Sequence, residues 1–381
     1  MRLEGTDVFS GTAFDIRIER GVITDLKTLS GGGDLPYIAP GFFDIQVNGY
    51  RGNDYNASDP DRDQLNNIVS DLEAAGVTRH FPTLITGPHE RTLKNVAIVA
   101  DLVSTSKELQ RAIPGIHLEG PYISSEDGPR GAHDPEFVRD PNWEEFLSWQ
   151  SAARGMIRLI TLAPERPGAQ EFIRRASSIG VRVALGHTAA DAETINAAIR
   201  AGASLSTHLG NGSHSPIPRL KNYIWQQLSC DELLASIITD GFHLPDSVIK
   251  VFWRAKGKER IILTSDVAVM GGRPPGVYRW GGIEVEVFSD GQLGLAGTEY
   301  LAGAAHLLDW DVPRCITATG CSLADAIAAC TTNPASFALQ EGVTRLEPGA
   351  SADLVQFRWR PGDQRLQIEQ TLRGGRIVYS A

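Results

Sequence analysis

The sequence has few cysteines and no long apolar run, and each of these features excludes a class of proteins. The four cysteines form no CxxC pair, so we expect reduced thiols in a cytoplasmic protein rather than a disulfide framework. No apolar run approaches the ~20 residues that a membrane span needs. No apolar signal region follows Arg2. The sequence therefore argues against disulfide-rich secreted proteins and membrane-spanning proteins.

Basic residues are also in the minority. The chain has 36 Lys and Arg residues against 46 Asp and Glu residues, which gives a net charge of −10 over 381 residues. This balance argues against a nucleic-acid partner bound by a basic face but says little about small-molecule ligands. Because no apolar run is long enough to span a membrane, no membrane partner is expected either. The sequence also lacks a repeat of fixed period and a low-complexity tract.

What the sequence does contain is a regular alternation of short apolar runs and longer helix-like stretches. Eight such runs cover residues 41–49, 79–85, 115–120, 156–164, 182–187, 204–210, 234–241 and 260–266. Strand–helix alternation repeated in this way predicts a parallel (β/α)8 TIM barrel of the α/β class. A doubly wound sheet is the alternative, but no GxGxxG motif follows the first run.

The two ends of the chain have a different pattern. Residues 1–40 and 346–381 contain short alternating strands and no obvious helix, so we expect them to form one small β-sandwich domain together. The barrel then comprises residues 41–345. Residues 276–295 predict a hairpin that extends from the barrel after the eighth strand.

Polar side chains stand at the ends of most predicted strands. The stretch GIHLEGPY, residues 115–122, closes an apolar run with Glu119, where a carboxylate is costly to bury without a partner. In TIM barrels the carboxyl ends of the strands carry the chemistry. The other polar residues at these ends are Gln46, Asn48, His187, His208, Asp240, His243 and Asp266.

Three of these residues suggest a metal site. Glu119, His187 and His208 offer one oxygen and two nitrogens, a set that suits Zn²⁺ or another divalent transition metal with one open position. Such a metal acidifies water for attack on a carbonyl. Asp266, at the last strand, is placed to take the water's proton and pass it to a leaving nitrogen. Each residue alone has a structural alternative, as a turn cap or a hydrogen-bonded core residue.

Several motifs resemble the amidohydrolase superfamily, and within it the deacetylases of N-acetyl amino sugar 6-phosphates. The resemblance extends over nearly the whole chain. It rests on PGFFDIQVNG (40–49), HLEGPY (117–122), GAHDPEFVR (131–139), TLAPE (161–165), LAGT (295–298) and TTNPA (331–335). The most specific feature is His133, which follows Glu119 by 14 residues.

The resemblance implies catalytic roles for five residues. Glu119, His187 and His208 would hold one metal, with Zn the first choice and Fe, Co or Mn as alternatives. Asp266 would be the general base and then the general acid, and His133 would polarise the acetamide carbonyl. Many amidohydrolases have His-x-His at the end of the first strand and bind a second metal. This chain has Gln46-Val47-Asn48 there, and amides are poor ligands for transition metals, so we expect one metal.

The resemblance also implies a phosphorylated amino sugar as substrate. The residues that would bind it are Gln46, Asn48, Asn211, Gly212, Arg219, His243, Ala296 and Gly297. In relatives the arginine reaches the neighbouring subunit's site, which implies a homodimer with shared active sites. One segment departs from the family pattern, because Gly210 and Gly212 flank Asn211. We expect these glycines to remove bulk beside the sugar and to loosen the loop.

Two other functions remain open from the sequence. A deacylase of N-acyl amino acids, or of a different amino sugar, would use the same metal, and the former would need a carboxylate clamp in place of the phosphate contacts. A non-catalytic barrel scaffold would be expected to lose a metal ligand or the last-strand aspartate. Here Glu119, His187, His208 and Asp266 are all present, which favours an enzyme that acts on a linear amide.

Overall fold

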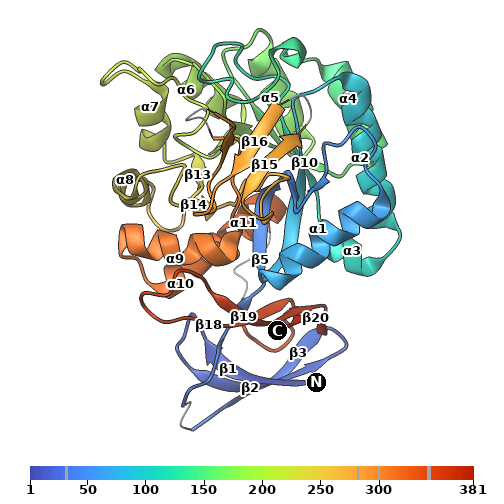
Figure 1. The fold of residues 1–381 in the computed structure, drawn as a ribbon, viewed down its shortest axis with the longest axis vertical. Coiled ribbons are helices and arrows are strands. Elements are labelled where there is room, and N and C mark those ends of the chain that lie inside the picture. The colour runs from blue at the N-terminus through green and yellow to red at the C-terminus, as the bar shows by residue number, and fades with distance from the viewer. Residues whose placement is uncertain (31–32, 281–282, 298–300, 341–344) are drawn as a thin grey trace.

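The computed structural model describes residues 1–30, 33–280, 283–297, 301–340 and 345–381. A barrel with surrounding helices forms one part, and a sheet built from both termini lies beneath it (Figure 1). Among the described residues, no helix combines the length and the apolar character needed to span a membrane.

Eight strands form the barrel, and one overlaps each predicted apolar run, although the second and the sixth strand begin one or two residues before their runs. They are β5 (Phe42–Val47), β8 (Val77–Ile85), β9 (Ile116–Glu119), β10 (Ile157–Leu162), β11 (Arg182–Leu185), β12 (Ala203–Ser206), β13 (Leu234–Ile237) and β14 (Ile261–Leu263). Neighbouring strands are parallel from β5 to β14 in chain order. A parallel bridge between Val47 and Val267 joins the first strand to the segment after the last. The TIM-barrel prediction is confirmed.

Helices surround this barrel and cover its outer face. They are α1 (Arg62–Ala74), α2 (His89–Ser104), α3 (Lys107–Ala112), α4 (Trp143–Ala152), α5 (Ala169–Ser178), α6 (Ala192–Ala201), α7 (Tyr223–Ser229), α8 (Asp246–Lys256), α9 (Leu308–Thr319), α10 (Leu323–Ala329) and α11 (Thr332–Leu339), with a short 3-10 turn at Pro135–Phe137. α6 illustrates how the sequence sets the bounds. Asp191 accepts a hydrogen bond from the Thr194 N–H at 2.9 Å, and Gly202 ends the helix at φ +119°.

The barrel core follows the alternation of its strands. Side chains that pack inside the barrel include Phe43, Ile45, Phe81, Leu159, Ala184, Leu205 and Ile262. A larger apolar layer between the strands and the helices includes Phe42, Leu118 and Ile160. Apolar side chains fill the lower interior, and the polar side chains of the predicted site lie toward the carboxyl ends of the strands.

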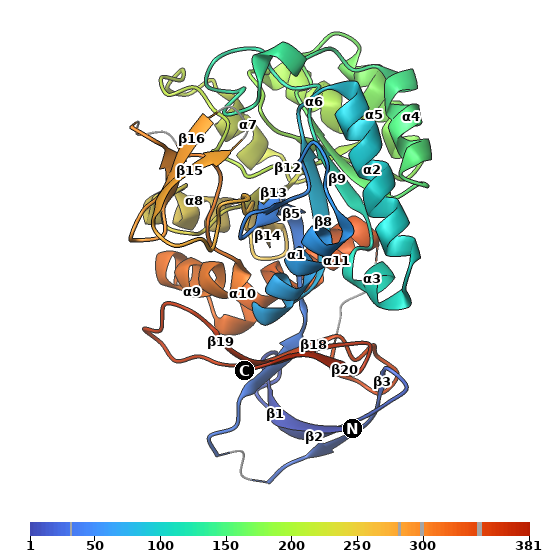
Figure 2. The same cartoon turned by 45° about the vertical axis from the view of Figure 1, so that its right-hand side comes forward.

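The small domain is a single sheet with seven strands in the order β20-β19-β18-β4-β1-β2-β3. Its strands are β1 (Arg2–Asp7), β2 (Ala13–Glu19), β3 (Val22–Thr28), β4 (Tyr37–Pro40), β18 (Leu354–Arg358), β19 (Gln367–Arg373) and β20 (Arg376–Ser380). The sheet curls so that its two halves face each other (Figure 2). They share a core that includes Ile16, Ile38 and Leu354. The predicted association of the two termini is confirmed.

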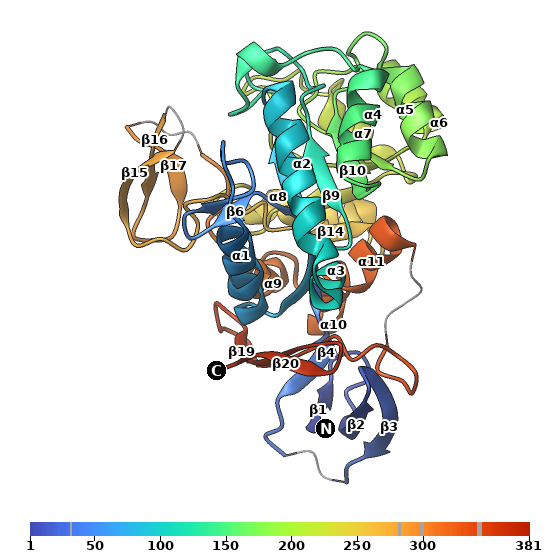
Figure 3. The ribbon, with the colours of Figure 1, turned by 90° about the vertical axis from the view of Figure 1, so that its right-hand side faces the viewer.

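A hairpin extends the barrel after β14, as predicted. β15 (Gly276–Trp280), β16 (Ile283–Val287) and β17 (Leu293–Leu295) form an antiparallel sheet; residues 281–282 of the predicted hairpin lie outside the described residues. This sheet lies beside β6 (Gly49–Tyr50) and β7 (Asn53–Asp54) (Figure 3). The Trp280 indole N–H donates to Asp54 Oδ2 at 3.2 Å, which fixes the hairpin against the first βα loop.

Candidate active site

Three of the predicted site residues adopt an unusual backbone conformation. His187, His208 and Asp266 follow β11, β12 and β14, and their φ angles are +51°, +28° and +50°. The left-handed region is unfavourable for residues with a Cβ, and it persists where the surroundings hold the backbone in place. Such strain concentrates at functional sites, which makes these three strand ends candidates for one.

Glu119 is the centre of the polar cluster at these strand ends. Its Oε1 lies 2.8 Å from His208 Nε2 and 3.2 Å from His187 Nε2. The two Nε2 atoms are 3.1 Å apart. All three side chains are buried. Burial alone would raise the pKa of Glu119, but the adjacent His187 and His208 rings hold that pKa well below the usual range.

A third histidine of the cluster comes from the loop after β9. His133 Nε2 lies 3.2 Å from His187 Nε2, and its Nδ1 lies 2.9 Å from Thr86 Oγ1. Ligand atoms of Glu119, His133 and His187 lie within 4.8 Å of one another. Burial lowers the pKa of His133 to about 3, so its ring is neutral. The cluster thus contains the predicted Glu119, His187 and His208 together with His133.

The proton positions in this cluster fit a bound cation. His187 Nδ1 lies 2.8 Å from the Pro129 carbonyl oxygen, which can only accept, so Nδ1 carries the proton of a neutral ring. The lone pair of His187 Nε2 then faces His133 Nε2, His208 Nε2 and Glu119 Oε1 together. Lone pairs that converge from imidazoles and a carboxylate are the donor set of a divalent transition metal.

Gln46 and Asn48 each contact another residue of the site. Gln46 Nε2 donates to Glu119 Oε1 at 2.9 Å, and Asn48 Nδ2 donates to Asp266 Oδ1 at 2.8 Å. Amide N–H groups orient the two carboxylates and offer no lone pair to a metal. The positions that hold histidines in two-metal amidohydrolases therefore support Glu119 and Asp266 here.

Asp266 has the properties of a proton-transfer group. Burial and the nearby negative charge of Glu119 raise the pKa of Asp266 to about 7, against the opposing effects of His208, His243 and Asn48. A carboxyl group that titrates near neutrality can take up and release a proton at physiological pH. Its side chain lines the same cavity as Glu119 and His133.

A cavity of about 790 Å³ opens over the cluster. The predicted site residues that line it are Glu119, His133, His187, His208, Asn211, Gly212, His243 and Asp266. The opposite wall, which the sequence did not predict, includes Asp54, Arg91, Arg279, Trp280 and the segment 301–303. His243 is oriented by Asp240, whose Oδ2 lies 2.7 Å from its Nδ1. The structure thus brings together residues from five strand ends and from the hairpin.

Five predicted substrate-binding residues are not among the residues that line this cavity. Gln46 and Asn48 contact Glu119 and Asp266 instead, and the other three are Arg219, Ala296 and Gly297. Arg219 is exposed, and its backbone carbonyl accepts from the Trp225 indole N–H at 3.3 Å. Ala296 donates its N–H to the Glu284 carbonyl at 3.0 Å, at the outer end of the hairpin, and Gly297 follows it. Residues 301–303 line the cavity in their place. Residue 298 of the LAGT motif lies outside the described residues.

The loop with two glycines corrects one expectation. A Cβ at Gly212 would lie 2.6 Å from His187 Nδ1, and a Cβ at Gly210 would lie 2.9 Å from Leu244 Cδ2. Neighbouring side chains therefore already fill the space that the missing methyl groups leave. The glycines let the loop pack closely on His187; they do not open space in the cavity beside it.

Sequence reasoning missed the residues that hold the site histidines. Thr86 contacts His133, and the Pro129 carbonyl fixes His187. Glu165 accepts hydrogen bonds from Thr188 Oγ1 at 2.5 Å and from the Ala189 N–H at 2.7 Å, which fixes the chain just after His187. The TLAPE motif contains Glu165, but only the structure shows what its carboxylate contacts.

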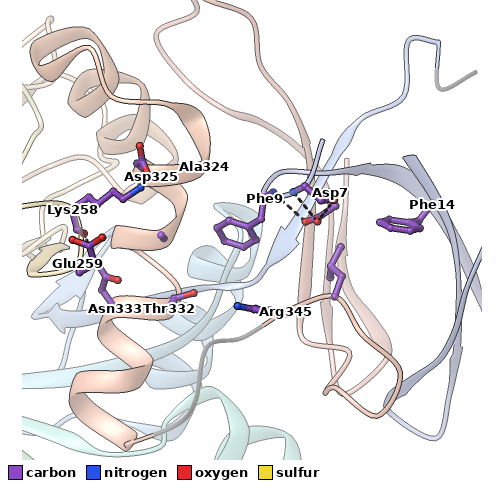
Figure 4. A pocket seen from close by; sticks show the side chains of 13 residues that line it. Asp7, Phe9, Phe14, Lys258, Glu259, Ala324, Asp325, Thr332, Asn333 and Arg345 are labelled. Atoms are coloured by element: carbon purple, nitrogen blue, oxygen red, sulfur yellow. Dashed lines mark hydrogen bonds and ion pairs between the residues drawn. The ribbon is translucent and has the colours of Figure 1, made fainter. Parts of the chain in front are cut away.

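A second cavity, of about 690 Å³, lies between the barrel and the terminal sheet (Figure 4). Three of the charged residues on its walls, Asp7, Lys258 and Asp325, already have partners within the protein. Lys258 Nζ lies 2.9 Å from Asp325, and the Asp7 carboxylate accepts from the N–H groups of Phe9 and Ser10. None of the predicted site residues is among those that line it. The chemistry is therefore assigned to the cavity above Glu119.

Comparison with known proteins supports this assignment. The model of the amidohydrolase family matches residues 37–378. A Bos taurus N-acetylglucosamine-6-phosphate deacetylase is 33% identical over 353 residues, which cover 90% of this chain and 83% of the bovine protein. The Bacillus subtilis enzyme of the same name is 31% identical over 327 residues, which cover 84% of this chain and 80% of that protein.

Solved structures show the same architecture. A variant of the Mycobacterium smegmatis N-acetyl-D-glucosamine-6-phosphate deacetylase, in complex with N-acetyl-D-glucosamine-6-phosphate, superposes with a TM-score of 0.87 at 28% identity and covers 99% of each chain. The Thermotoga maritima N-acetylglucosamine-6-phosphate deacetylase gives a TM-score of 0.87 at 25% identity over 100% of each chain.

Proposed function

The chain belongs to the amidohydrolase family, and from this premise we propose that it hydrolyses the acetamide of N-acetylglucosamine 6-phosphate. The products are acetate and glucosamine 6-phosphate. The observation that carries the proposal is the convergence of Glu119, His187 and His208 in a cavity that also contains Asp266. The names of the similar proteins supply the substrate.

Glu119, His187 and His208 would hold one divalent metal, with Zn as first choice and Fe, Co or Mn as alternatives. Gln46 keeps Glu119 in place through its 2.9 Å hydrogen bond. When bound, the metal supplies positive charge that acidifies water and polarises a carbonyl. Because Gln46 and Asn48 donate hydrogen bonds to the site carboxylates, we assign one metal per chain.

The proton transfers belong to Asp266. Its carboxylate takes a proton from the attacking water while the water oxygen bonds to the acetyl carbon. It then gives that proton to the sugar nitrogen as the C–N bond breaks, so that the amine leaves neutral. Asn48 holds Asp266 Oδ1 at 2.8 Å. His133, whose Nδ1 faces Thr86, orients and polarises the acetyl carbonyl through Nε2.

The substrate phosphate is bound by His243 and by the loop that carries Asn211 and the Gly212 backbone. His243 Nδ1 faces Asp240, which leaves Nε2 for a phosphate oxygen. We assign the remaining charge to Arg219 of the partner subunit in a homodimer, because Arg219 is exposed in its own chain and its guanidinium can bind phosphate bidentately. Gln46, Asn48, Ala296 and Gly297 would act on the substrate indirectly.

A panel of acetamides tests the reaction. N-acetylglucosamine, N-acetylgalactosamine and N-acetylmannosamine, each with and without the 6-phosphate, and two N-acetyl amino acids are incubated with the metal-loaded protein. We expect acetate release to be fastest with N-acetylglucosamine 6-phosphate. Faster release from an N-acetyl amino acid would replace the proposal with the amino-acid deacylase, and no release from any member would overturn it.

Arg219 has its own test. Arg219→Ala should raise KM strongly for the phosphorylated sugar and change little for the unphosphorylated one, because a lost contact to a charged group costs about 1.5–3 kcal/mol. Mixing Arg219→Ala chains with Asp266→Asn chains gives one site with both intact groups in each mixed dimer. Activity should then partly return. If subunit exchange is demonstrated and no activity returns, the shared site is excluded.

We also place the protein in the cytoplasm, which the four unpaired cysteines support. Fractionation of cells that express the chain tests this, with a cytoplasmic and a secreted marker as controls. Recovery of the protein with the secreted marker would overturn the assignment.

A further inference from the structure

Asp44 is a buried carboxylate beneath the active site, and the reaction described above does not use it. It lies on β5 and is fully buried, with 0% exposure. Its Oδ1 accepts from Thr264 Oγ1 at 2.7 Å and from the Gln46 N–H at 3.2 Å. The Ser265 N–H lies 3.2 Å from both carboxylate oxygens. One side chain therefore contacts the ends of the first and the last barrel strands.

These contacts lie at the seam of the barrel. Among the described residues, β5 and β14 are the two edges of the strand order, and no strand ladder joins them. The seam is closed instead by the bridge between Val47 and Val267 and by the Asn48 N–H, which donates to the Val267 carbonyl at 2.9 Å. Asp44 precedes Val47 on β5 and adds side-chain hydrogen bonds to Thr264 and Ser265, in the part of the seam where the two strands have no backbone pairing.

Asp266 lies on this seam, directly after the residues that Asp44 holds. Its backbone has φ +50°, a conformation that persists only when neighbouring groups fix it. The Ala304 N–H holds the Asp266 carbonyl at 3.3 Å from the following side. On the preceding side, Asp44 fixes Thr264 and Ser265. Loss of these bonds would free the peptide that sets the direction of the Asp266 side chain.

We propose that Asp44 is a positioning residue that fixes Asp266 and Gln46 relative to each other across the barrel seam. Gln46 in turn donates to Glu119, so Asp44 sets the separation between the proton-transfer carboxylate and the metal-binding carboxylate. A displacement of about 1 Å at a reacting group can reduce turnover by about 10²-fold. The role rests on the proposed function for its kinetic consequence but not for its structural one.

Asp44→Asn tests the role with two independent measurements. We expect hydrogen exchange in residues 264–268 to accelerate at least tenfold while the other barrel strands are unchanged, because the asparagine Nδ2, itself a donor, replaces Oδ2 opposite the Ser265 N–H. We expect kcat to fall at least tenfold with KM within twofold and with metal content unchanged. In an Asp266→Asn background, the additional Asp44→Asn substitution should lower kcat by less than twofold, because the carboxylate that Asp44 positions is already absent.

The matched control is Lys256→Met, which removes another buried charge from α8, away from the seam. It should lower thermal stability without changing kcat or exchange at 264–268. If Asp44→Asn does not fold, Thr264→Val removes only the 2.7 Å hydrogen bond and should give the same effects at smaller size.

Normal exchange at 264–268 together with a wild-type kcat, in whichever variant folds, would overturn the role. Kinetic effects that add fully to those of Asp266→Asn would also overturn it. If the wild-type protein hydrolyses no member of the acetamide panel, the proposed function fails, and the exchange measurement still decides the structural role of Asp44.

Discussion

Two assemblies of buried polar residues in this barrel differ in how completely their polar atoms are hydrogen-bonded. Lys256 on α8 is fully buried, and its Nζ donates to the carbonyl oxygens of Gln227, Cys230 and Leu233 at 2.6, 2.7 and 2.8 Å. An ammonium group has three N–H donors, and here each has an acceptor. Burial lowers the pKa of Lys256 to about 8, so the charged form still predominates at neutral pH.

The cluster at Glu119 is buried to a similar degree, but its partners do not match. His187 Nε2 has three polar neighbours and, with the proton on Nδ1, no proton to share with them. His208 Nδ1 is buried and has no hydrogen-bond partner in the part of the chain that the structure describes. The Lys256 assembly therefore has a complete set of partners, whereas the Glu119 assembly is incomplete, which fits a group that binds a ligand.

The largest expected effect follows from removing a ligand of the incomplete assembly. His208→Ala should abolish both tight metal binding and turnover, because only Glu119 and His187 of the expected ligands remain. Metal content after dialysis, circular dichroism and acetate release measure this. Lys256→Met should keep both metal and turnover. A His208→Ala protein that retained one tightly bound metal per chain would contradict the ligand assignment.

The next effect separates chemistry from metal binding. Asp266→Asn is nearly isosteric and keeps the position of Asn48's partner, so metal content should be unchanged. It removes proton transfer, so kcat should fall by ~10²-fold or more. Single-turnover and steady-state kinetics with the phosphorylated sugar measure the loss. A wild-type kcat would exclude Asp266 as the base.

The pH dependence of turnover gives a third test. Because the base must be ionised, kcat/KM should fall about tenfold per pH unit below the pKa of Asp266, which burial and Glu119 raise to about 7. A cation at Glu119 favours the ionised form of Asp266, so in the metal-loaded enzyme this decrease of kcat/KM, the acidic limb of the pH profile, should have its midpoint at or below pH 7. The residual activity of Asp266→Asn should lack the limb. Persistence of the same limb in that variant would assign it to another group.

Lys256→Met should change stability and not activity. It removes the side-chain donor of three buried carbonyl oxygens, of which only that of Cys230 has another donor among the described residues, the Leu233 N–H at 3.3 Å. An unsatisfied buried group costs about 1–3 kcal/mol. We expect the free energy of unfolding to fall by about 3 kcal/mol, measured by urea denaturation of the metal-loaded protein, with kcat unchanged at a temperature where the variant is folded. A drop in kcat without loss of stability would place Lys256 with the functional assembly instead.

Residue periodicity predicted the barrel and the strand ends, but it could not predict which polar residues support the site. Glu119, His187, His208 and Asp266 end strands, and parallel strands bring their carboxyl ends together, so their convergence follows from sequence order. Gln46 and Asn48 were visible at the first strand, but their hydrogen bonds to Glu119 and Asp266 depend on side-chain direction.

Loop residues were harder to place. His133 lies in the long connection after β9, and only family resemblance singled it out, because no periodicity predicts where a loop returns. Arg279 and Trp280 reach the cavity from a hairpin that the sequence predicted without an orientation. Asp44 reads as an ordinary polar residue in an apolar strand, since its partners Thr264 and Ser265 lie more than two hundred residues away in the chain.

The smallest expected effect concerns the two glycines beside the metal cluster. A methyl group at Gly212 would lie 2.6 Å from His187 Nδ1 and 2.9 Å from His187 Cε1, on a backbone with φ +55°. The ring cannot move freely, because Nδ1 also binds the Pro129 carbonyl at 2.8 Å. Gly212→Ala should therefore displace His187 and weaken metal affinity by ~10-fold, the lower end of what disturbed outer partners of a metal ligand cost.

Gly210→Ala is the matched control for this substitution. Its methyl group would meet Leu244 and Phe252 and would not reach His187, so it should lower thermal stability and leave metal affinity unchanged. Competition with a chelator of known affinity measures the metal, and thermal denaturation of the apoprotein measures stability. Equal losses of metal affinity in both variants would show that the loop acts on His187 only through its general rigidity. A selective loss in Gly212→Ala would show instead that close backbone approach sets the position of this ligand, which is the property that separates the incomplete assembly from the complete one.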